Sequence, residues 1–141
     1  MEDIIKKEHY YEHSIEKVWN AISVADEISS WFIKADFKAE VGYKYTFTSK
    51  ENDCSQITGI VKAANPYTLI YTWIVAGTDV ETTVKWVLEE TNEGTKLYLE
   101  HSGILNYSNA TAIEFFNNFN NGWDNCFTKL SAYLTQEVHA G

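Results

Sequence analysis

Residues 111–134 read TAIEFFNNFNNGWDNCFTKLSAYL. Apolar side chains recur there every three or four positions for about six turns, the spacing that places residues on one face of an α-helix. Thr111 and Glu114 have the spacing of a capping box, which satisfies free backbone N–H groups where a helix begins. The segment therefore predicts one long C-terminal helix from near Thr111, with an apolar face formed by Ile113, Phe116, Phe119, Trp123, Cys126, Phe127, Leu130, Tyr133 and Leu134.

Most of the chain before this helix alternates between apolar and polar residues, as half-buried strands do. The alternation runs through five segments separated by turn residues such as Asn65-Pro66 and Asn92-Glu93-Gly94. Strands joined by such short turns pair in an antiparallel sheet. The positions expected to share the inward face include Tyr45, Phe47, Leu69, Tyr71, Trp73, Val84, Trp86, Leu88, Leu97, Leu99 and His101.

One further strand and two short helices open the chain. The strand begins near Ile4, and Ser14 is a good N-cap for the first helix. Trp31 and Phe32 end the second helix. The sequence therefore predicts an α+β fold in a single domain, residues 1–141. A curved antiparallel sheet of about six strands surrounds the long C-terminal helix, and the two short helices follow the first strand.

The charge balance argues against several classes of partner. The chain of 141 residues has 11 basic and 20 acidic residues, and its net charge is −9. Nucleic acids and anionic membranes bind proteins through Lys and Arg, so neither is an expected partner. The N-terminus lacks the apolar centre of a signal peptide, and Cys54, in a polar turn region, and Cys126 are the two cysteines. We therefore expect a reduced, cytoplasmic protein.

The usual chemical motifs are absent from the sequence. His9 and His13 straddle the end of a strand rather than one helix face, and there is no HExxH or paired-cysteine motif for a metal. There is also no nucleophile elbow and no glycine-rich phosphate loop. We therefore expect no metal and no cofactor, and the sequence assigns no catalytic residue. An enzyme is less favoured than a binding protein.

Two residues each allow two interpretations. His101 shares a strand face with Leu97 and Leu99, so its side chain is expected to point toward the helix. It either orients a ligand or moves a proton, or it is a core histidine held by hydrogen bonds. Gly122 interrupts the long helix, where glycine costs about 1 kcal/mol relative to alanine. It either lets the helix approach the sheet closely or leaves volume for a ligand.

Aromatic residues are unusually frequent, with five Trp, nine Tyr and seven Phe. Large rings fill cores, and they also line ligand cavities. Alternation and helical spacing direct many of them toward the space between sheet and helix. The candidate ligand-binding residues are Trp31, Tyr45, Phe47, Trp73, Trp86, His101, Phe119 and Trp123.

Several local motifs, in this order, resemble those of a known family. They are SIEKVW at 14–19, ISSWF at 28–32, GYKY at 42–45, LIYTW at 69–73, TVKWVL at 83–88, GTKLYLEHSG at 94–103 and Gly122-Trp123. Together they resemble the START-like (SRPBCC) superfamily, and within it the AHSA1-like group named after the activator of heat-shock-protein-ninety ATPase. The resemblance implies a helix-grip fold with a cavity between sheet and helix. It also implies that the region of Trp31 and Phe32 closes one end of that cavity.

Three functions follow as hypotheses. The first is a binding domain for a small apolar or aromatic molecule held between the sheet and the C-terminal helix. The second is a cyclase-like enzyme acting on a polyketide or another hydrophobic substrate, as the resemblance implies for the wider superfamily. The third is a chaperone-associated stress-response protein. The expected partners are a small hydrophobic or aromatic molecule and, at most, a second copy of the chain in a weak homodimer.

Overall fold

The computed structural model describes residues 3–48 and 56–140, with side chains to residue 135. Cys54 and its predicted turn lie outside the described residues. In chain order the elements are β1 (Ile4–Tyr11), α1 (Ile15–Ser23), α2 (Ala25–Trp31), β2 (Lys34–Asp36), β3 (Lys44–Thr48), β4 (Gln56–Asn65), β5 (Thr68–Val75), β6 (Glu81–Glu90), β7 (Thr95–Ser102), the 3₁₀-helix η1 (Ile104–Asn106) and α3 (Asn109–Ala140).

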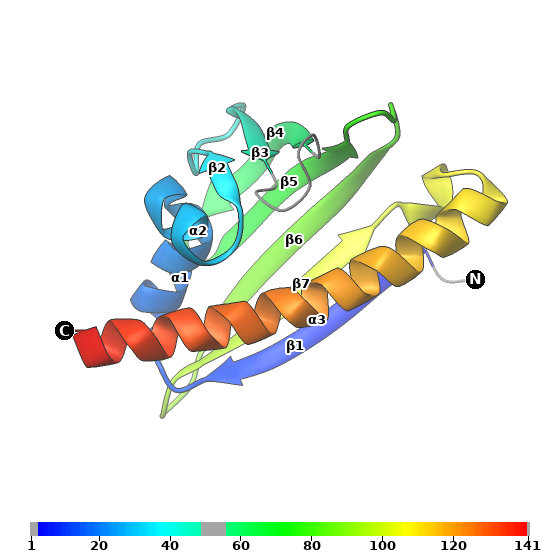
Figure 1. Ribbon diagram of the computed structural model, residues 1–141. Coiled ribbons are helices and arrows are strands. Elements are labelled where there is room, and N and C mark those ends of the chain that lie inside the picture. The colour runs from blue at the N-terminus through cyan, green and yellow to red at the C-terminus, as the bar shows by residue number, and fades with distance from the viewer. Residues whose placement is uncertain (1–2, 49–55, 141) are drawn as a thin grey trace.

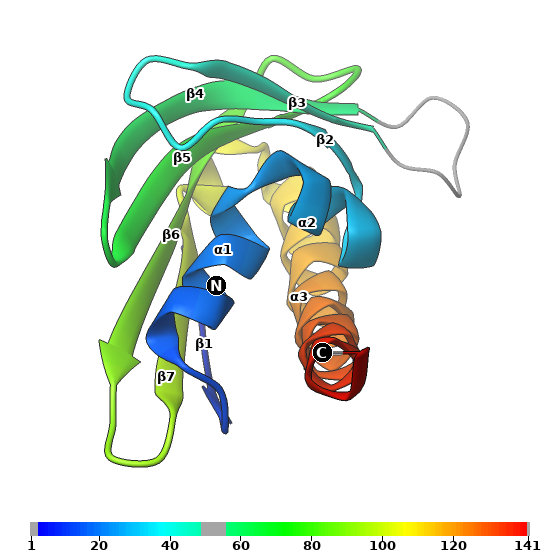
Figure 2. The same ribbon diagram turned by 90° about the vertical axis from the view of Figure 1, so that its left-hand side faces the viewer.

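Within the described residues, seven strands form one antiparallel sheet in the order β1-β7-β6-β5-β4-β3-β2. Figure 1 shows α3 lying across this sheet, with β1 and β7 beside it. The side view in Figure 2 shows the sheet curving around α3 and the two short helices, all on its concave side. The predicted helix-grip α+β fold is therefore confirmed.

The sheet has one strand more than the sequence predicts. The additional strand, β2, pairs with β3 at the sheet edge, with Lys34 opposite Thr48 and Asp36 opposite Thr46. It contains three residues, which is too short for an alternating pattern to be distinguished from a loop. The other strands and the two short helices match the prediction. Ser14 caps α1 as predicted, because its Oγ accepts a hydrogen bond from the Lys17 N–H at 3.3 Å.

The long helix differs from the prediction at its N-terminal end. It begins at Asn109, so Thr111 lies in its first turn instead of capping it, and Ser108 precedes the helix. Ile113, predicted to be inward, is 54% exposed, whereas Ala112 is fully buried. Neighbouring residues of a helix are rotated by about 100° about its axis. The prediction placed Ile113 on the buried face, whereas the smaller Ala112 occupies it. From Trp123 to Leu134 the predicted buried face is confirmed, with Trp123, Cys126, Phe127, Leu130 and Leu134 all buried.

A glycine allows two strands to meet closely where the sheet bends. The β4–β5 pairing shifts register between Val61 and Ala63. Near this irregularity, a Cβ atom added to Gly59 would lie 2.1 Å from the Thr72 carbonyl oxygen. The same carbonyl accepts a hydrogen bond from the Tyr45 hydroxyl, and the Thr72 hydroxyl accepts one from the Ile60 N–H at 2.8 Å. Glycine in a strand interior commonly marks such a close backbone approach.

We expect Gly59→Ala to lower the free energy of unfolding by about 3 kcal/mol, because the new methyl group collides with backbone that cannot move aside. Gly122→Ala is the matched control. A Cβ there would meet no atom within 4 Å, so the better helix propensity of alanine should raise stability by about 1 kcal/mol. Urea titration of both variants measures the difference. Equal stability of the two variants would contradict the close approach of β4 and β5.

Candidate functional site

Aromatic rings from the sheet and from α3 meet on the concave side of the sheet. The ring centroids of Trp73 and Trp123 lie 5.4 Å apart, and those of Trp86 and Trp123 lie 5.6 Å apart in an edge-to-face contact. The His101 ring stacks on Phe119 with its centroid 4.5 Å away. Such ring pairs add to the stability that burial alone provides. The helix is therefore joined to the sheet mainly through ring contacts.

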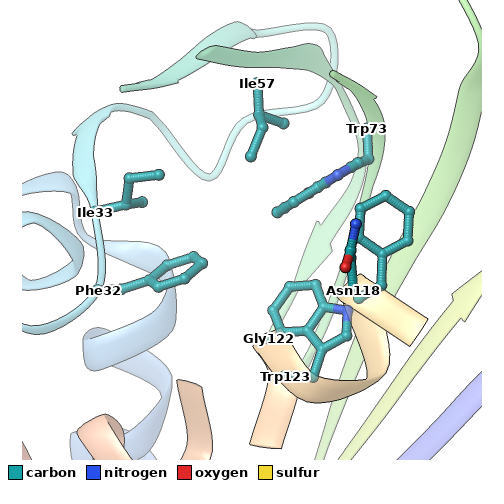
Figure 3. A pocket seen from close by; sticks show the side chains of 8 residues that line it. Phe32, Ile33, Ile57, Trp73, Asn118, Gly122 and Trp123 are labelled. Atoms are coloured by element: carbon teal, nitrogen blue, oxygen red, sulfur yellow. The ribbon is translucent and has the colours of Figure 1, made fainter. Parts of the chain in front are cut away.

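A small pocket opens beside this aromatic contact, between the end of α2, the strands β4 and β5, and the middle of α3. Its volume is about 150 Å³. Figure 3 shows Phe32 and Ile33 on one side, Ile57 and Trp73 on the sheet side, and Asn118, Gly122 and Trp123 on the helix. The lining residues are Phe32, Ile33, Ile57, Trp73, Asn118, Phe119, Gly122 and Trp123.

Gly122 keeps the pocket open. A Cβ atom at this position would meet no atom of the described residues within 4 Å, so the glycine is not needed for a close approach between helix and sheet. Of the two interpretations of Gly122, the structure therefore supports the one in which glycine leaves volume. Asn118, one helical turn earlier, lines the same pocket.

The structure brings three of the eight candidate residues to the pocket: Trp73, Phe119 and Trp123. Trp31, Phe47 and Trp86 instead surround an adjoining space of about 10 Å³, the size of a single water at most. Tyr45 and His101 are buried at 1% and 0% exposure and line neither space. The candidate list omitted Phe32, Ile33, Ile57, Asn118 and Gly122. The position of Asn118 could have been predicted from its spacing of one helical turn to Gly122. Ile33 and Ile57 have no distinctive sequence signal.

Trp31 joins the two short helices. Its indole Nε1 donates a hydrogen bond to the Ala21 carbonyl at 2.8 Å, which ties the end of α2 to α1. The Trp31 ring also stacks on Phe32, with the centroids 5.2 Å apart. Phe32 in turn forms part of the pocket wall. At this end of the pocket, Phe32 forms the wall and Trp31 packs against it.

His101 is held by hydrogen bonds at both ring nitrogens. The Trp123 indole donates to its Nδ1 at 3.0 Å, and its Nε2 lies 2.7 Å from the Thr82 hydroxyl. An indole N–H can only donate, so Nδ1 must be the unprotonated nitrogen and the neutral ring carries its proton on Nε2. The Thr82 hydroxyl then accepts from His101 and donates to the Trp73 carbonyl at 3.1 Å. These contacts support the interpretation of His101 as a core histidine.

Burial in this network lowers the pKa of His101 from 6.5 to about 3. Protonation would place an N–H of the imidazolium against the Trp123 N–H. This donor–donor contact disfavours the charged ring and so lowers the pKa of His101, as burial does. A histidine that stays neutral throughout the physiological range is a poor proton shuttle. Among the described residues that line the pocket, none has an ionisable side chain.

Two other kinds of site were sought in the described part of the chain. No group of three or more His, Cys, Asp or Glu residues there is arranged to hold a metal ion. Over the same residues, no helix combines the length and the apolar character needed to cross a membrane.

The fold and the pocket together define a helix-grip domain of the START-like class with a small apolar pocket between sheet and helix. The model of the family described as activator of Hsp90 ATPase homolog 1-like protein matches residues 12–135. The chain belongs to this family.

Solved structures with the same fold come from several bacteria. The protein MLL2253 of Mesorhizobium loti is 28% identical, with a TM-score of 0.83 over 94% of this chain and 97% of that one. The protein BH1534 of Bacillus halodurans is 27% identical, with a TM-score of 0.75 over 93% and 96%. DynU16, from the dynemicin biosynthetic locus, is 19% identical with a TM-score of 0.81, over 96% of this chain and 48% of that one, and shows likeness of fold. A comparison with curated proteins finds no match.

We expect the His101 ring to remain neutral between pH 5 and 8. The unfolded chain takes up a proton near pH 6.5, and the folded protein does so only near pH 3, so stability should fall as the pH drops through this interval. The loss attributable to His101 approaches about 1.4 kcal/mol per pH unit. Imidazole ¹⁵N shifts against pH measure the titration and the tautomer. A midpoint between pH 6 and 7, or a proton on Nδ1, would contradict the network.

We expect Trp123→Ala to lower the free energy of unfolding by about 3–5 kcal/mol, because it removes a buried ring and leaves the His101 Nδ1 without its donor. Trp123→Phe retains most of the ring contacts and should lose clearly less. Denaturant titration of both variants checks this order. A loss below about 1 kcal/mol for Trp123→Ala would show that this side chain is not part of the core.

Proposed function

We propose that the domain binds a small apolar or aromatic molecule, about one aromatic ring in size, in the pocket between β4, β5, the end of α2 and α3. The observation that carries this proposal is an apolar pocket of about 150 Å³ that a glycine keeps open. Apolar cavities of about this volume in other proteins hold one benzene-sized ring. The proposed contacts are Trp73, Phe119 and Trp123, together with Phe32, Ile33 and Ile57.

The remaining candidates act indirectly in this proposal. Trp31 supports Phe32, and His101 orients Trp123 through the hydrogen bond to its indole. Tyr45, Phe47 and Trp86 form the packed core behind the pocket. A ligand buried against the pocket walls gains affinity in proportion to the apolar area removed from water.

A cyclase-like enzyme is the second candidate. The resemblance of fold to DynU16, a protein of a biosynthetic locus, is the observation that favours it. Pockets for larger substrates usually have volumes of about 300–1,000 Å³, well above that of the present pocket. The neutral, buried His101 and the non-ionisable lining residues also favour binding over proton transfer.

A chaperone-associated role has less support from the surface. Such a role would need a contiguous exposed apolar patch. Among the described residues, the exposed large apolar side chains are Tyr10, Val24, Val41, Leu105 and Ile113, which come from five different segments of the chain.

The cellular setting and the other partners are also proposals. The net charge of −9 supports the absence of nucleic acid and of an anionic membrane among the partners, and the cytoplasmic location stays a prediction from the sequence. A weak homodimer stays a prediction, which sedimentation velocity at two concentrations tests.

Benzene, toluene and indole should raise the melting temperature, because a ligand that binds only the folded state stabilises it. Benzene and toluene should also change the tryptophan fluorescence, since Trp73 and Trp123 line the pocket beside them. Gly122→Leu should abolish both effects, since the new side chain occupies the pocket without meeting another atom at its Cβ. Asn121→Leu is the matched control: it adds the same side chain at the neighbouring exposed position, outside the pocket lining, and should still bind.

The two variants separate the outcomes. Loss of binding in Gly122→Leu alone locates the ligand in the pocket. Equal binding by both variants would place the ligand elsewhere, and no response of the unsubstituted protein to any of the three ligands would overturn the proposal.

A further inference from the structure

One tryptophan that lines the pocket, Trp73, has an indole N–H without an acceptor. Trp73 is 5% exposed, and its Nε1 is buried with no hydrogen-bond partner among the described residues. Figure 3 shows the Trp73 ring extending from β5 into the pocket, between Ile57 and Trp123. A buried donor without an acceptor is unfavourable and is uncommon in native proteins.

The other three buried tryptophans all have acceptors. Trp31 donates to the Ala21 carbonyl at 2.8 Å, Trp86 to the Tyr71 hydroxyl at 2.9 Å and Trp123 to His101 at 3.0 Å. The unpaired indole is therefore not a general property of this aromatic core. Of the two tryptophans that line the pocket, Trp123 is paired and Trp73 is not.

The remaining polar side chain of the pocket is Asn118. Figure 3 shows its amide between Trp73 and Trp123, at the helix side of the pocket. An amide group offers two N–H donors and one acceptor, whereas the indole can only donate. The lining thus carries one unpaired indole N–H and one amide group within walls that are otherwise apolar. Its described residues include no Lys, Arg or His.

We infer that the ligand is an uncharged single-ring aromatic compound that carries a carbonyl oxygen, such as an aromatic ketone or aldehyde. The ring occupies the apolar pocket. A small shift of the Trp73 ring uncovers its buried N–H for the ligand oxygen, and the Asn118 amide is a second donor. A carboxylate does not fit, because its charge would lose hydration with no cation among the lining residues to compensate. This inference rests on the proposed function and narrows its ligand class.

The test uses two ligands of nearly the same shape. Acetophenone has a carbonyl oxygen where α-methylstyrene has a CH₂ group, and benzoate serves as the charged probe. The dissociation constants of the two neutral ligands are measured for the unsubstituted protein and for Trp73→Phe, which removes the N–H and keeps an aromatic ring. Trp19→Phe is the matched control, because Trp19 is half-buried against Tyr67 and outside the pocket lining.

In Trp73→Phe, the affinity ratio of acetophenone to α-methylstyrene should fall by about three- to tenfold, the effect of one neutral hydrogen bond. Trp19→Phe should leave the ratio unchanged, and benzoate should bind much more weakly than acetophenone to the unsubstituted protein. In ¹H–¹⁵N spectra, acetophenone should shift the Trp73 indole proton downfield and α-methylstyrene should not. This spectrum gives an answer even if Trp73→Phe does not fold.

Three results would overturn parts of the proposal separately. If both neutral ligands bind and their ratio is unchanged in Trp73→Phe, or both move the Trp73 indole proton alike, the carbonyl class is wrong and aromatic binding stands. If no neutral ligand binds the unsubstituted protein, the proposed function fails as well. Tight binding of benzoate would show that the ligand is an anion.

Discussion

The hydrogen bond from Trp123 to His101 sets how α3 meets the sheet. It joins the middle of the helix to β7 through two buried side chains, and His101 continues the connection to Thr82 on β6 and to the Trp73 backbone on β5. Each group in this series has one available role, because the indole can only donate and the carbonyl can only accept. One tautomer of one imidazole therefore connects α3 with three neighbouring strands.

The pocket lies next to the hydrogen-bonded pair of Trp123 and His101, at the edge of the closely packed core. On one side of Trp123 the rings of Trp73 and Trp86 pack at centroid distances below 6 Å. Around Gly122, on the adjoining part of the helix, no side chain of the described residues fills the space between α3 and the ends of α2 and β4. A rigid contact beside an unfilled volume is a suitable arrangement for binding, because the walls are held in place before a ligand enters.

The sequence predicted most of the fold and less of the site, for physical reasons. Period-two alternation identified β3 to β7, and helical spacing identified the buried face of α3 from Trp123 onward. The three residues of β2 were too few to show a period, and Ile113 was chosen where the smaller Ala112 is buried. The excess of aromatic residues predicted that rings would line the pocket. The open volume itself depends on Gly122, which has no side chain, and Ile57 comes near it only through the tertiary fold. The neutral tautomer of His101 likewise depends on a partner that is distant in sequence.

Gly122 also has a consequence for how this domain can change by mutation. Replacing it with a larger residue would fill the pocket and at the same time improve the helix, so stability and ligand capacity oppose each other at this position. Most core changes that remove a function also destabilise the protein, and selection for folding removes them. Here the loss of the proposed binding would carry no such penalty in stability. A helix-grip domain of this kind can therefore turn into a purely packed scaffold in one substitution, and only selection on the ligand itself would prevent it.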